Sequence, residues 1–249
     1  MKDDKVRVSV ITVTYNSEKT FEDTIFSVLG QQMSPYEYIV VDGASTDNTV
    51  ALIEGHRADF EEKGIKLTVV SEPDKGIYDA MNKGIKLAEG DIVGIINSDD
   101  YYEDNAVAVA ARAYEKEPYD LFYADLRMIK PDGSSFIKHS RYRKYATSRD
   151  WNHPTTFISK TMYDRFSYRT DTIHDDYDLI LRIRKAGAKV TVVNEVIANF
   201  RMNGVSHERS IKKAMERVGI KYGIYRRNGY SPLYIFECLL VETGKLIIG

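Results

Sequence analysis

The sequence predicts an α/β fold in which a single mixed, mostly parallel sheet carries helices on both faces. In the first part of the chain, short β-branched runs alternate with segments of helical period, an order that builds parallel βαβ units. Clusters of polar residues stand where several of these runs end, and ligands bind at that edge of a parallel sheet. The second half adds a hairpin and further helices, so we expect one large domain with a C-terminal helical extension.

Four segments of the first half are predicted to be buried strands because β-branched residues dominate them. They span residues 6–13, 38–41, 66–70 and 91–96. The spacing of apolar residues predicts helices over residues 17–29, with Ser17 as N-cap, about 46–57 and about 78–87. Right-handed crossovers then place these helices on both faces of the sheet.

The second half has a different pattern. Residues 121–129 and 134–139 are predicted strands, joined by the turn Lys130-Pro131-Asp132-Gly133. We expect a helix over residues 175–185, a strand over 189–193 and a helix from about 207 to 225. Residues 141–150 are basic and aromatic without a clean period.

Composition restricts the class of protein. Of the 249 residues, 43% are hydrophobic and 29% are charged, which excludes disordered and fibrous classes. A net charge of −2 argues against a nucleic-acid partner. The single cysteine, Cys238, excludes a disulfide framework and a cysteine-based zinc site.

The chain shows no pattern of a targeting or spanning segment. Its first seven residues are charged and lack the apolar stretch of a secretory signal. No window reaches the roughly 18 uninterrupted apolar residues of a spanning helix. We therefore expect a cytoplasmic protein, with a peripheral place at the inner face of the cell membrane as the alternative.

The predicted strands of the first half end in polar residues. These are Thr14-Tyr15-Asn16, Asp42, Glu72-Pro73-Asp74 and Asn97-Ser98-Asp99-Asp100. No glycine-rich loop follows the first strand, so the dinucleotide and P-loop patterns are both missing. The Asp99–Asp100 pair offers another way to hold phosphates, because carboxylates bind Mg²⁺ or Mn²⁺ and the metal binds the phosphates. The alternative is that these residues cap the next helix.

Four blocks of sequence resemble family 2 glycosyltransferases, which have the GT-A fold. They are residues 8–16 (VSVITVTYN), 39–49 (IVVDGASTDNT), 72–84 (EPDKGIYDAMNKG) and 97–100 (NSDD), the last at the position of the family's D-x-D motif. The blocks stand in the family's order and spacing over roughly residues 6 to 105. The resemblance implies a nucleoside-diphosphate sugar as donor and Mn²⁺ or Mg²⁺ as cofactor.

The resemblance also implies roles for the strand-end residues. Thr14, Tyr15 and Asn16 would lie against the nucleotide base, with the tyrosine as stacking face; Tyr15 closing the core is the alternative. Asp42 is similar to the family acid that binds base or ribose, although an Asx-turn role fits the same residue. Asp79 is similar to an acid that meets the base or the donor, and a first-turn helix acid is its alternative.

The last block departs from the family pattern. Asn97 stands at the first acidic position of D-x-D, and an amide accepts a hydrogen bond from a sugar hydroxyl without contributing charge. Asn97, Ser98 and Asp99 are therefore expected beside the donor, and Asp99 or Asp100 is expected to bind the metal. Which of the two acids coordinates stays open.

A general base is expected on the acceptor side, remote in sequence from the metal residues. Residues 173–179 (IHDDYDL) resemble the family's second acidic motif, in which the later acid is the base. This assigns the base to Asp176, with Asp175 as its catalytic neighbour. Alternatively, both are first-turn acids that stabilise a helix N-terminus by about 0.3–1 kcal/mol each.

Three further segments are candidates for the same site. Residues 151–157 (WNHPTTF) line the acceptor or sugar pocket in one interpretation, and His153 is a core histidine in the other. Residues 200–207 (FRMNGVSH) resemble a family loop near the diphosphate, where Arg201 or His207 stabilises the leaving phosphate or binds metal; the alternative is a surface turn. Residues 141–149 either grip an anionic or lipid-linked acceptor or form a solvated face.

The resemblance implies an inverting, metal-assisted hexosyl or related transferase acting on a glycan or lipid-linked acceptor in cell-surface polysaccharide assembly. Residues 1–205 would form the catalytic domain, with a nucleotide-binding part over about 1–105 and an acceptor part over about 106–205. Residues 206–249 would form the helical extension, whose apolar stretch packs on the domain, dimerises or lies on a membrane.

Two other functions fit the sequence less well. A sugar-1-phosphate nucleotidyltransferase requires an early glycine-rich, basic loop, which the sequence lacks. A non-catalytic nucleotide-sugar binder would have lost one of the acidic pairs, and both are present.

Overall fold

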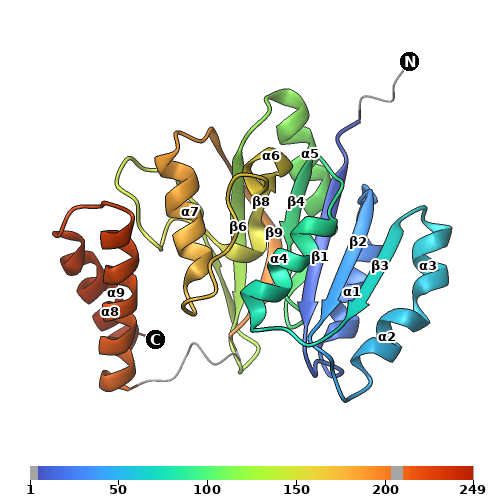
Figure 1. Ribbon diagram of the computed structural model, residues 1–249, viewed down its shortest axis with the longest axis horizontal. Coiled ribbons are helices and arrows are strands. Elements are labelled where there is room, and N and C mark those ends of the chain that lie inside the picture. The colour runs from blue at the N-terminus through green and yellow to red at the C-terminus, as the bar shows by residue number, and fades with distance from the viewer. Residues whose placement is uncertain (1–4, 203–209, 249) are drawn as a thin grey trace.

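The computed structural model describes residues 5–202 and 210–248. Its first half forms four parallel strands, β1 (Val8–Thr14), β2 (Glu37–Asp42), β3 (Lys66–Ser71) and β4 (Ile92–Ile95), in the spatial order β3-β2-β1-β4 (Figure 1). The residues of β1, β2 and β4 are buried throughout, as expected of parallel strands with both faces covered.

The sheet continues through strands of the second half. The short strand β8 (Thr156–Ser159) pairs antiparallel with both β4 and β6 (Leu121–Ile129), and so joins the two halves. Beyond it, β9 (Val190–Arg201) runs parallel to β6, while β5 (Tyr101–Tyr102) and β7 (Ser135–Lys138) pair antiparallel with β9 and β6. The predicted α/β class with a single mixed sheet is confirmed.

Helices cover both faces of this sheet. One face carries α1 (Phe21–Leu29), α2 (Thr49–Gly55), α3 (Arg57–Glu62) and α5 (Ala106–Lys116). The other carries α4 (Ile77–Leu87), the short α6 (Lys160–Tyr163) and α7 (Asp175–Lys185). Alternate side chains of β1 join the two hydrophobic clusters, with Val10 on the first face and Ile11 on the second.

The C-terminal helices α8 (Ile211–Arg227) and α9 (Tyr234–Ile248) form a hairpin beside α7, at the left of Figure 1. The hydroxyls of Tyr177 and Tyr225 lie 2.7 Å apart between α7 and α8. Between α8 and α9, the buried Lys221 ammonium lies 2.7 Å from the Glu242 carboxylate. No helix in the described part of the chain is long and apolar enough to cross a membrane.

Two predicted helices begin later than the sequence indicated. The first begins at Phe21 rather than Ser17, because the Ser17 N–H donates to Thr49 Oγ1 and ties that residue to the start of α2. The second begins at Thr49 rather than residue 46, because the Asp47 carboxylate accepts from the Thr49 N–H. That helix is also interrupted at His56, which separates α2 from α3.

The last predicted strand and helix differ in extent. The strand predicted over 189–193 runs to Arg201, because two register shifts let β9 continue along β6 past Val193. The helix predicted from about residue 207 begins at Ile211 and ends at Arg227. Residues 203–209 lie outside the described part of the chain.

Candidate active site

A pocket of about 410 Å³ lies at the carboxyl ends of β1 and β4. Two segments that are remote in sequence meet there because β1 and β4 are adjacent in the sheet. Five of the predicted donor-site residues line it together: Thr14, Tyr15, Asn97, Ser98 and Asp99. The pocket thus lies at the sheet edge where ligands were expected to bind.

Two buried polar atoms of residues that line the pocket lack a partner in the part of the chain that the structure describes. Thr14 Oγ1 and Asn97 Oδ1 are buried, and neither has a hydrogen-bond partner among the described residues. The Tyr15 side chain is 62% exposed, so its ring offers an open stacking face instead of closing the core. Ser98 differs, because its hydroxyl donates to Ser17 Oγ at 2.8 Å and joins the end of β4 to the segment after β1.

The two acids of the Asp99–Asp100 pair occupy different environments. Asp99 lines the pocket, whereas Asp100 is fully buried behind it. Arg201, at the end of β9, holds the turn: its N–H donates to Asp100 Oδ1 at 3.0 Å and its guanidinium to the Asp99 carbonyl at 3.0 Å. The same guanidinium pairs with Asp23 and lies over the Tyr101 ring. Arg201 is thus a positioning residue behind the pocket and is not among its lining residues.

The chemistry of the pair fits a divalent cation. Asp100 Oδ2 is buried and has no hydrogen-bond partner within residues 5–202 and 210–248. Burial raises the pKa of Asp99, and burial together with the Asp99 charge raises the pKa of Asp100 well above its ordinary value. A bound cation would offset both effects. The described residues hold no cluster of three or more metal-ligating side chains, so a cation here would be bound mainly by the pair, phosphate and water.

The raised pKa of Asp100 predicts how metal-free stability depends on pH. Above the ordinary value of 3.8 the unfolded chain loses this proton while the folded chain keeps it, so the free energy of unfolding falls as pH rises towards the folded pKa. Asp100→Asn should flatten this fall and be more stable than wild type at neutral pH. Urea unfolding in EDTA between about pH 4 and about pH 8 measures it. Parallel curves for the two proteins would contradict the prediction.

Asp42 and Asn16 lie beside the pocket but support its turns. Asp42 is buried, and its carboxylate accepts from the Ser45 N–H at 2.9 Å, from the Ser45 hydroxyl and from the Ser71 hydroxyl at 2.6 Å. Asn16 Oδ1 accepts from the Thr46 N–H at 2.9 Å. These contacts favour the turn-supporting alternative for both residues, and their contact with a base stays a prediction.

Asp79 also makes local contacts. It stands in the first turn of α4, accepts from the Lys75 N–H at 3.1 Å and lies 3.8 Å from the Lys83 ammonium. It is not among the lining residues of the pocket, so the helix-terminus alternative describes its position best.

Asp74, one of the polar residues expected at this sheet edge but assigned no role from the sequence, lines the pocket. Its Oδ1 accepts from the Gly76 N–H at 2.7 Å, which shapes the loop before α4. A β-carbon at Gly43 would lie 2.6 Å from Asp74 Oδ2, so only glycine permits this carboxylate to come so close to the end of β2. The signal was its place in the third sequence block, directly after a strand end.

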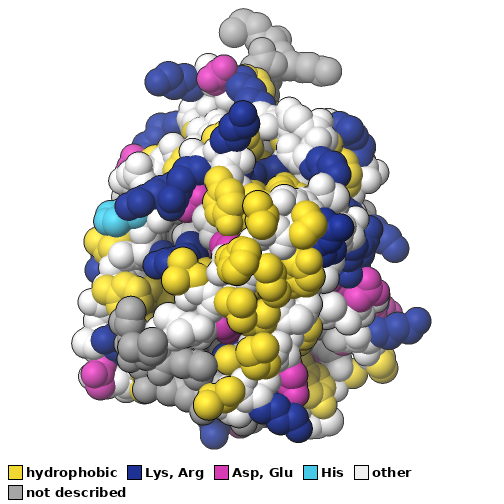
Figure 2. Space-filling view, turned by 90° about the vertical axis from the view of Figure 1, so that its left-hand side faces the viewer, with side chains coloured by type: hydrophobic (Ala, Val, Ile, Leu, Met, Phe, Trp, Pro, Cys, Tyr) yellow, Lys and Arg dark blue, Asp and Glu magenta, His cyan; other side chains and the backbone are white. Residues whose placement is uncertain are grey.

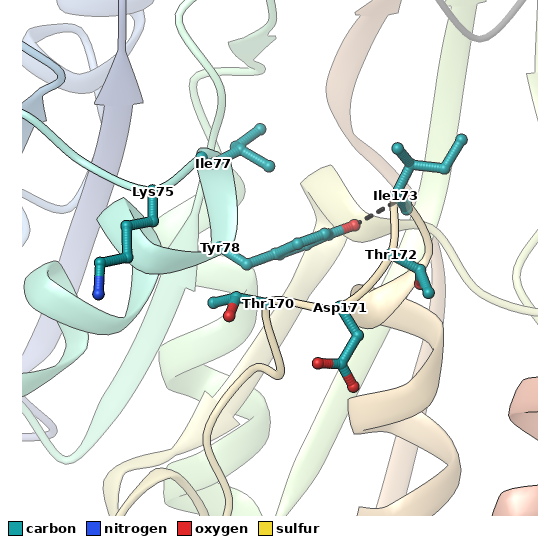
Figure 3. A pocket seen from close by; sticks show the side chains of 8 residues that line it. Lys75, Ile77, Tyr78, Thr170, Asp171, Thr172 and Ile173 are labelled. Carbon is teal, nitrogen blue, oxygen red and sulfur yellow. Dashed lines mark hydrogen bonds between the residues drawn. The ribbon is translucent and has the colours of Figure 1, made fainter.

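A second pocket, of about 240 Å³, adjoins the first, because Gly76 and Ile77 line both. It lies between the start of α4 and the loop that precedes α7 (Figure 3). The Tyr78 ring spans it and donates a hydrogen bond from its hydroxyl to the Ile173 carbonyl at 3.0 Å. The same ring stacks on Tyr168 at 5.3 Å. The sequence did not predict Tyr78 as a site residue, because its pattern is that of an ordinary aromatic residue at the start of a helix.

The two predicted catalytic acids differ in their contacts. Asp175 is buried and accepts from the Asp171 N–H, the Thr172 N–H and hydroxyl and the Arg227 guanidinium at 2.6–3.0 Å. Burial would raise the pKa of Asp175, but these hydrogen bonds lower it below its ordinary value. Asp176 is partly exposed; its carboxylate accepts from the Tyr177 N–H of its own helix at 2.7 Å and also interacts with the Tyr78 phenol. Asp175 is thus occupied in shaping the loop, whereas the contacts of Asp176 leave its carboxylate less constrained.

Asp176 lies close to Tyr78, which spans the second pocket, and to His153. Burial raises the pKa of the Tyr78 phenol, and the Asp176 carboxylate adds to the increase. Burial lowers the pKa of His153, and Asp176 opposes that shift. His153 Nε2 lies 3.4 Å from the Tyr168 hydroxyl, so the histidine belongs to this aromatic group around Asp176. His207, the other predicted candidate histidine, lies outside the described residues.

Several known proteins are similar to this chain in sequence. The model of the family described as glycosyl transferase family 2 matches residues 9–185. A PGL/p-HBAD biosynthesis glycosyltransferase of Mycobacterium tuberculosis is 34% identical over 122 residues, which are 48% of this chain and 46% of that protein. The chondroitin synthase of Escherichia coli is 24% identical over 259 residues, covering 96% of this chain and 36% of that protein. The chain thus spans less than half the length of either relative.

Two solved structures share the fold. S. aureus TarS 1-349 in complex with UDP-GlcNAc has a TM-score of 0.68 and 19% identity, over 96% of this chain and 72% of that one. The mannosyltransferase PcManGT from Pyrobaculum calidifontis, in complex with GDP-Man and Mn²⁺, has a TM-score of 0.69 and 20% identity, over 98% and 71%. At these identities the likeness concerns the fold alone, and it confirms the predicted GT-A fold. Because the family model covers most of the residues that form the sheet and both pockets, the chain belongs to glycosyl transferase family 2.

Proposed function

We propose that this chain transfers a sugar from a nucleoside-diphosphate sugar to a hydroxyl group of a glycan or lipid-linked acceptor, in cell-surface polysaccharide assembly. The observation that carries the proposal is the pair of adjoining pockets, one lined by Asp99 and the other near Asp176, with Gly76 and Ile77 between them. The relatives support it, since they include a chondroitin synthase and structures that bind UDP-GlcNAc or GDP-Man.

In this proposal the donor occupies the larger pocket. The exposed Tyr15 ring stacks on the nucleotide base, and the unpartnered Thr14 and Asn97 oxygens hydrogen-bond to donor groups. Asp99 and Asp100 hold Mg²⁺ or Mn²⁺, which when bound neutralises charge on the diphosphate. Arg201 keeps the turn that carries both acids in place.

The acceptor enters from the smaller pocket. Asp176 takes the proton of the acceptor hydroxyl on a carboxylate oxygen as that hydroxyl oxygen bonds to the anomeric carbon. The hydroxyl oxygen attacks from the face opposite the diphosphate, the bond from the anomeric carbon to the diphosphate oxygen breaks with its electron pair, and configuration at this carbon inverts. Tyr78 and His153 border Asp176 and limit the access of water to it.

The test is a transfer assay with a panel of UDP-, GDP- and dTDP-sugars and Mn²⁺, which measures released nucleoside diphosphate. We expect release with at least one donor, stimulation by a glycan or lipid-linked acceptor, and loss of release in EDTA. A non-catalytic binder would bind a nucleotide sugar in calorimetry without releasing the diphosphate, and that outcome would overturn the proposal.

A further inference from the structure

The helical hairpin of α8 and α9 exposes an apolar stripe on its outer surface. Five side chains of this stripe are 55–75% exposed: Ile211, Met215, Leu233, Phe236 and Leu240. Figure 2 shows apolar side chains running down this face, with Lys and Arg side chains on both sides of them. The opposite side of α9 packs on the domain through other residues, so the stripe is additional to the core contacts of the hairpin.

The basic, aromatic segment over residues 141–149 packs on α9, the helix that carries part of this stripe. The Tyr145 ring stacks on Tyr234 of α9 at 4.7 Å, with the two planes 5° apart. The Thr147 hydroxyl donates to Glu237 of α9 at 2.6 Å. This segment, for which the sequence predicted no helix or strand, is therefore held against the domain-facing side of α9, and its exposed cations lie near the hairpin.

The cations of this border are exposed and unpaired. Arg141, Lys144 and Arg149 of the segment, and Lys212 of α8, have no acidic partner in the described part of the chain. In contrast, Lys221 of α8 is buried and paired with an acid of the hairpin. The fold thus separates cations that hold the hairpin together from cations that flank the apolar stripe.

We propose that this face, defined as the apolar stripe of α8 and α9 with its cationic borders, docks on the surface of an anionic lipid bilayer. Apolar side chains would enter the interface and the flanking cations would meet lipid phosphates, with the helices lying in the membrane plane. Tyr142 and Tyr145, each about half exposed, suit the same depth because tyrosine has an apolar ring and a polar hydroxyl. A second copy fits less well, because a two-fold interface would set the same cationic borders against each other.

The docking face is connected to the acceptor side. Arg227, at the end of α8, lies 3.3 Å from Asp171, 3.0 Å from Asp175 and 2.8 Å from Asp178. Asp171 lines the smaller pocket. If the proposed transfer is correct, docking would hold this pocket near acceptors carried by the bilayer; the docking itself does not depend on that activity.

Co-sedimentation with vesicles tests the proposal. The wild-type chain should sediment with phosphatidylglycerol–phosphatidylcholine vesicles, remain in the supernatant with pure phosphatidylcholine, and dissociate as salt rises. Leu233→Ser/Phe236→Ser/Leu240→Ser should weaken the partition by about tenfold or more. Arg141→Gln/Lys144→Gln/Arg149→Gln should weaken it by about a hundredfold. Phe26→Ser is the matched control, since Phe26 is 51% exposed on α1, which covers the other face of the sheet.

Three outcomes would overturn docking on a bilayer. They are no sedimentation of wild type, equal loss in the Phe26→Ser control, or a concentration-dependent dimer that the apolar variant dissociates while vesicles bind neither protein. Circular dichroism melting curves of the variants, which change exposed side chains only, report whether each is folded. Calorimetric binding of a nucleotide sugar is measured on the same samples, so that failure of docking is distinguished from failure of the proposed function.

Discussion

Asp176→Asn is expected to lower kcat about 10²–10⁴-fold, the usual contribution of a general base, while the affinity for the donor stays unchanged. The asparagine keeps the shape of the side chain, and its amide oxygen can still accept from the Tyr177 N–H at 2.7 Å. It cannot take the proton of an acceptor hydroxyl. Steady-state rates of sugar transfer, with donor affinity measured by calorimetry, separate the two effects.

Asp175→Asn is the contrasting variant at the adjacent position. In wild type the Asp175 carboxylate accepts four hydrogen bonds, including one from Arg227. Replacing it should therefore lower the free energy of unfolding by about 1–3 kcal/mol. Any loss of rate should follow that loss of folded protein. If Asp175→Asn abolished turnover in a fully folded protein while Asp176→Asn remained active, the assignment of the base would be reversed.

Asp99→Asn is expected to lower kcat/KM about 10²–10³-fold, because the acid that lines the donor pocket would lose its charge. Asn97 already replaces one acid of the usual motif, so this segment would keep a single acid, Asp100, which is fully buried behind the pocket. The rate should also lose its response to Mn²⁺. Transfer rates across a Mn²⁺ titration measure this.

Asp91→Asn is a suitable control for that variant. Asp91 stands directly before β4, at the end of the strand remote from the pocket, where it binds Arg7. It is therefore close to the same strand but does not line the pocket. We expect its rates and Mn²⁺ response to match wild type. An equal fall in both variants would mean that the strand is sensitive to any lost acid and that the donor site has been assigned wrongly.

The donor half of the fold could be predicted because local patterns determine it. The β-branched runs of β1 and β4 and the polar residues after them fix which side chains reach the sheet edge, and Thr14, Tyr15, Asn97 and Asp99 do line one pocket. The helix α5 was missed because its run of alternating alanine and valine is buried on all sides and shows no helical period.

The roles of the individual site residues could not all be predicted from local sequence patterns. Asp42 and Asp79 are correctly placed at strand and helix ends, but their hydrogen bonds depend on serine and loop N–H groups whose direction no periodicity indicates. Asp175 depends on Arg227, which is 52 residues away in the sequence and arrives only when α8 packs on α7. Such contacts between distant segments determine which acid of a pair is held by structural hydrogen bonds.

Asp99 and Asp100 are proposed to form a metal-dependent diphosphate site. Isothermal titration calorimetry of a nucleoside diphosphate tests it most directly, with wild type and Asp99→Asn in Mn²⁺ and in EDTA. We expect wild type to bind only with Mn²⁺ and Asp99→Asn to gain no affinity from the metal. Equal affinity in EDTA, or an Asp99→Asn variant that responds to Mn²⁺ as wild type does, would contradict the account.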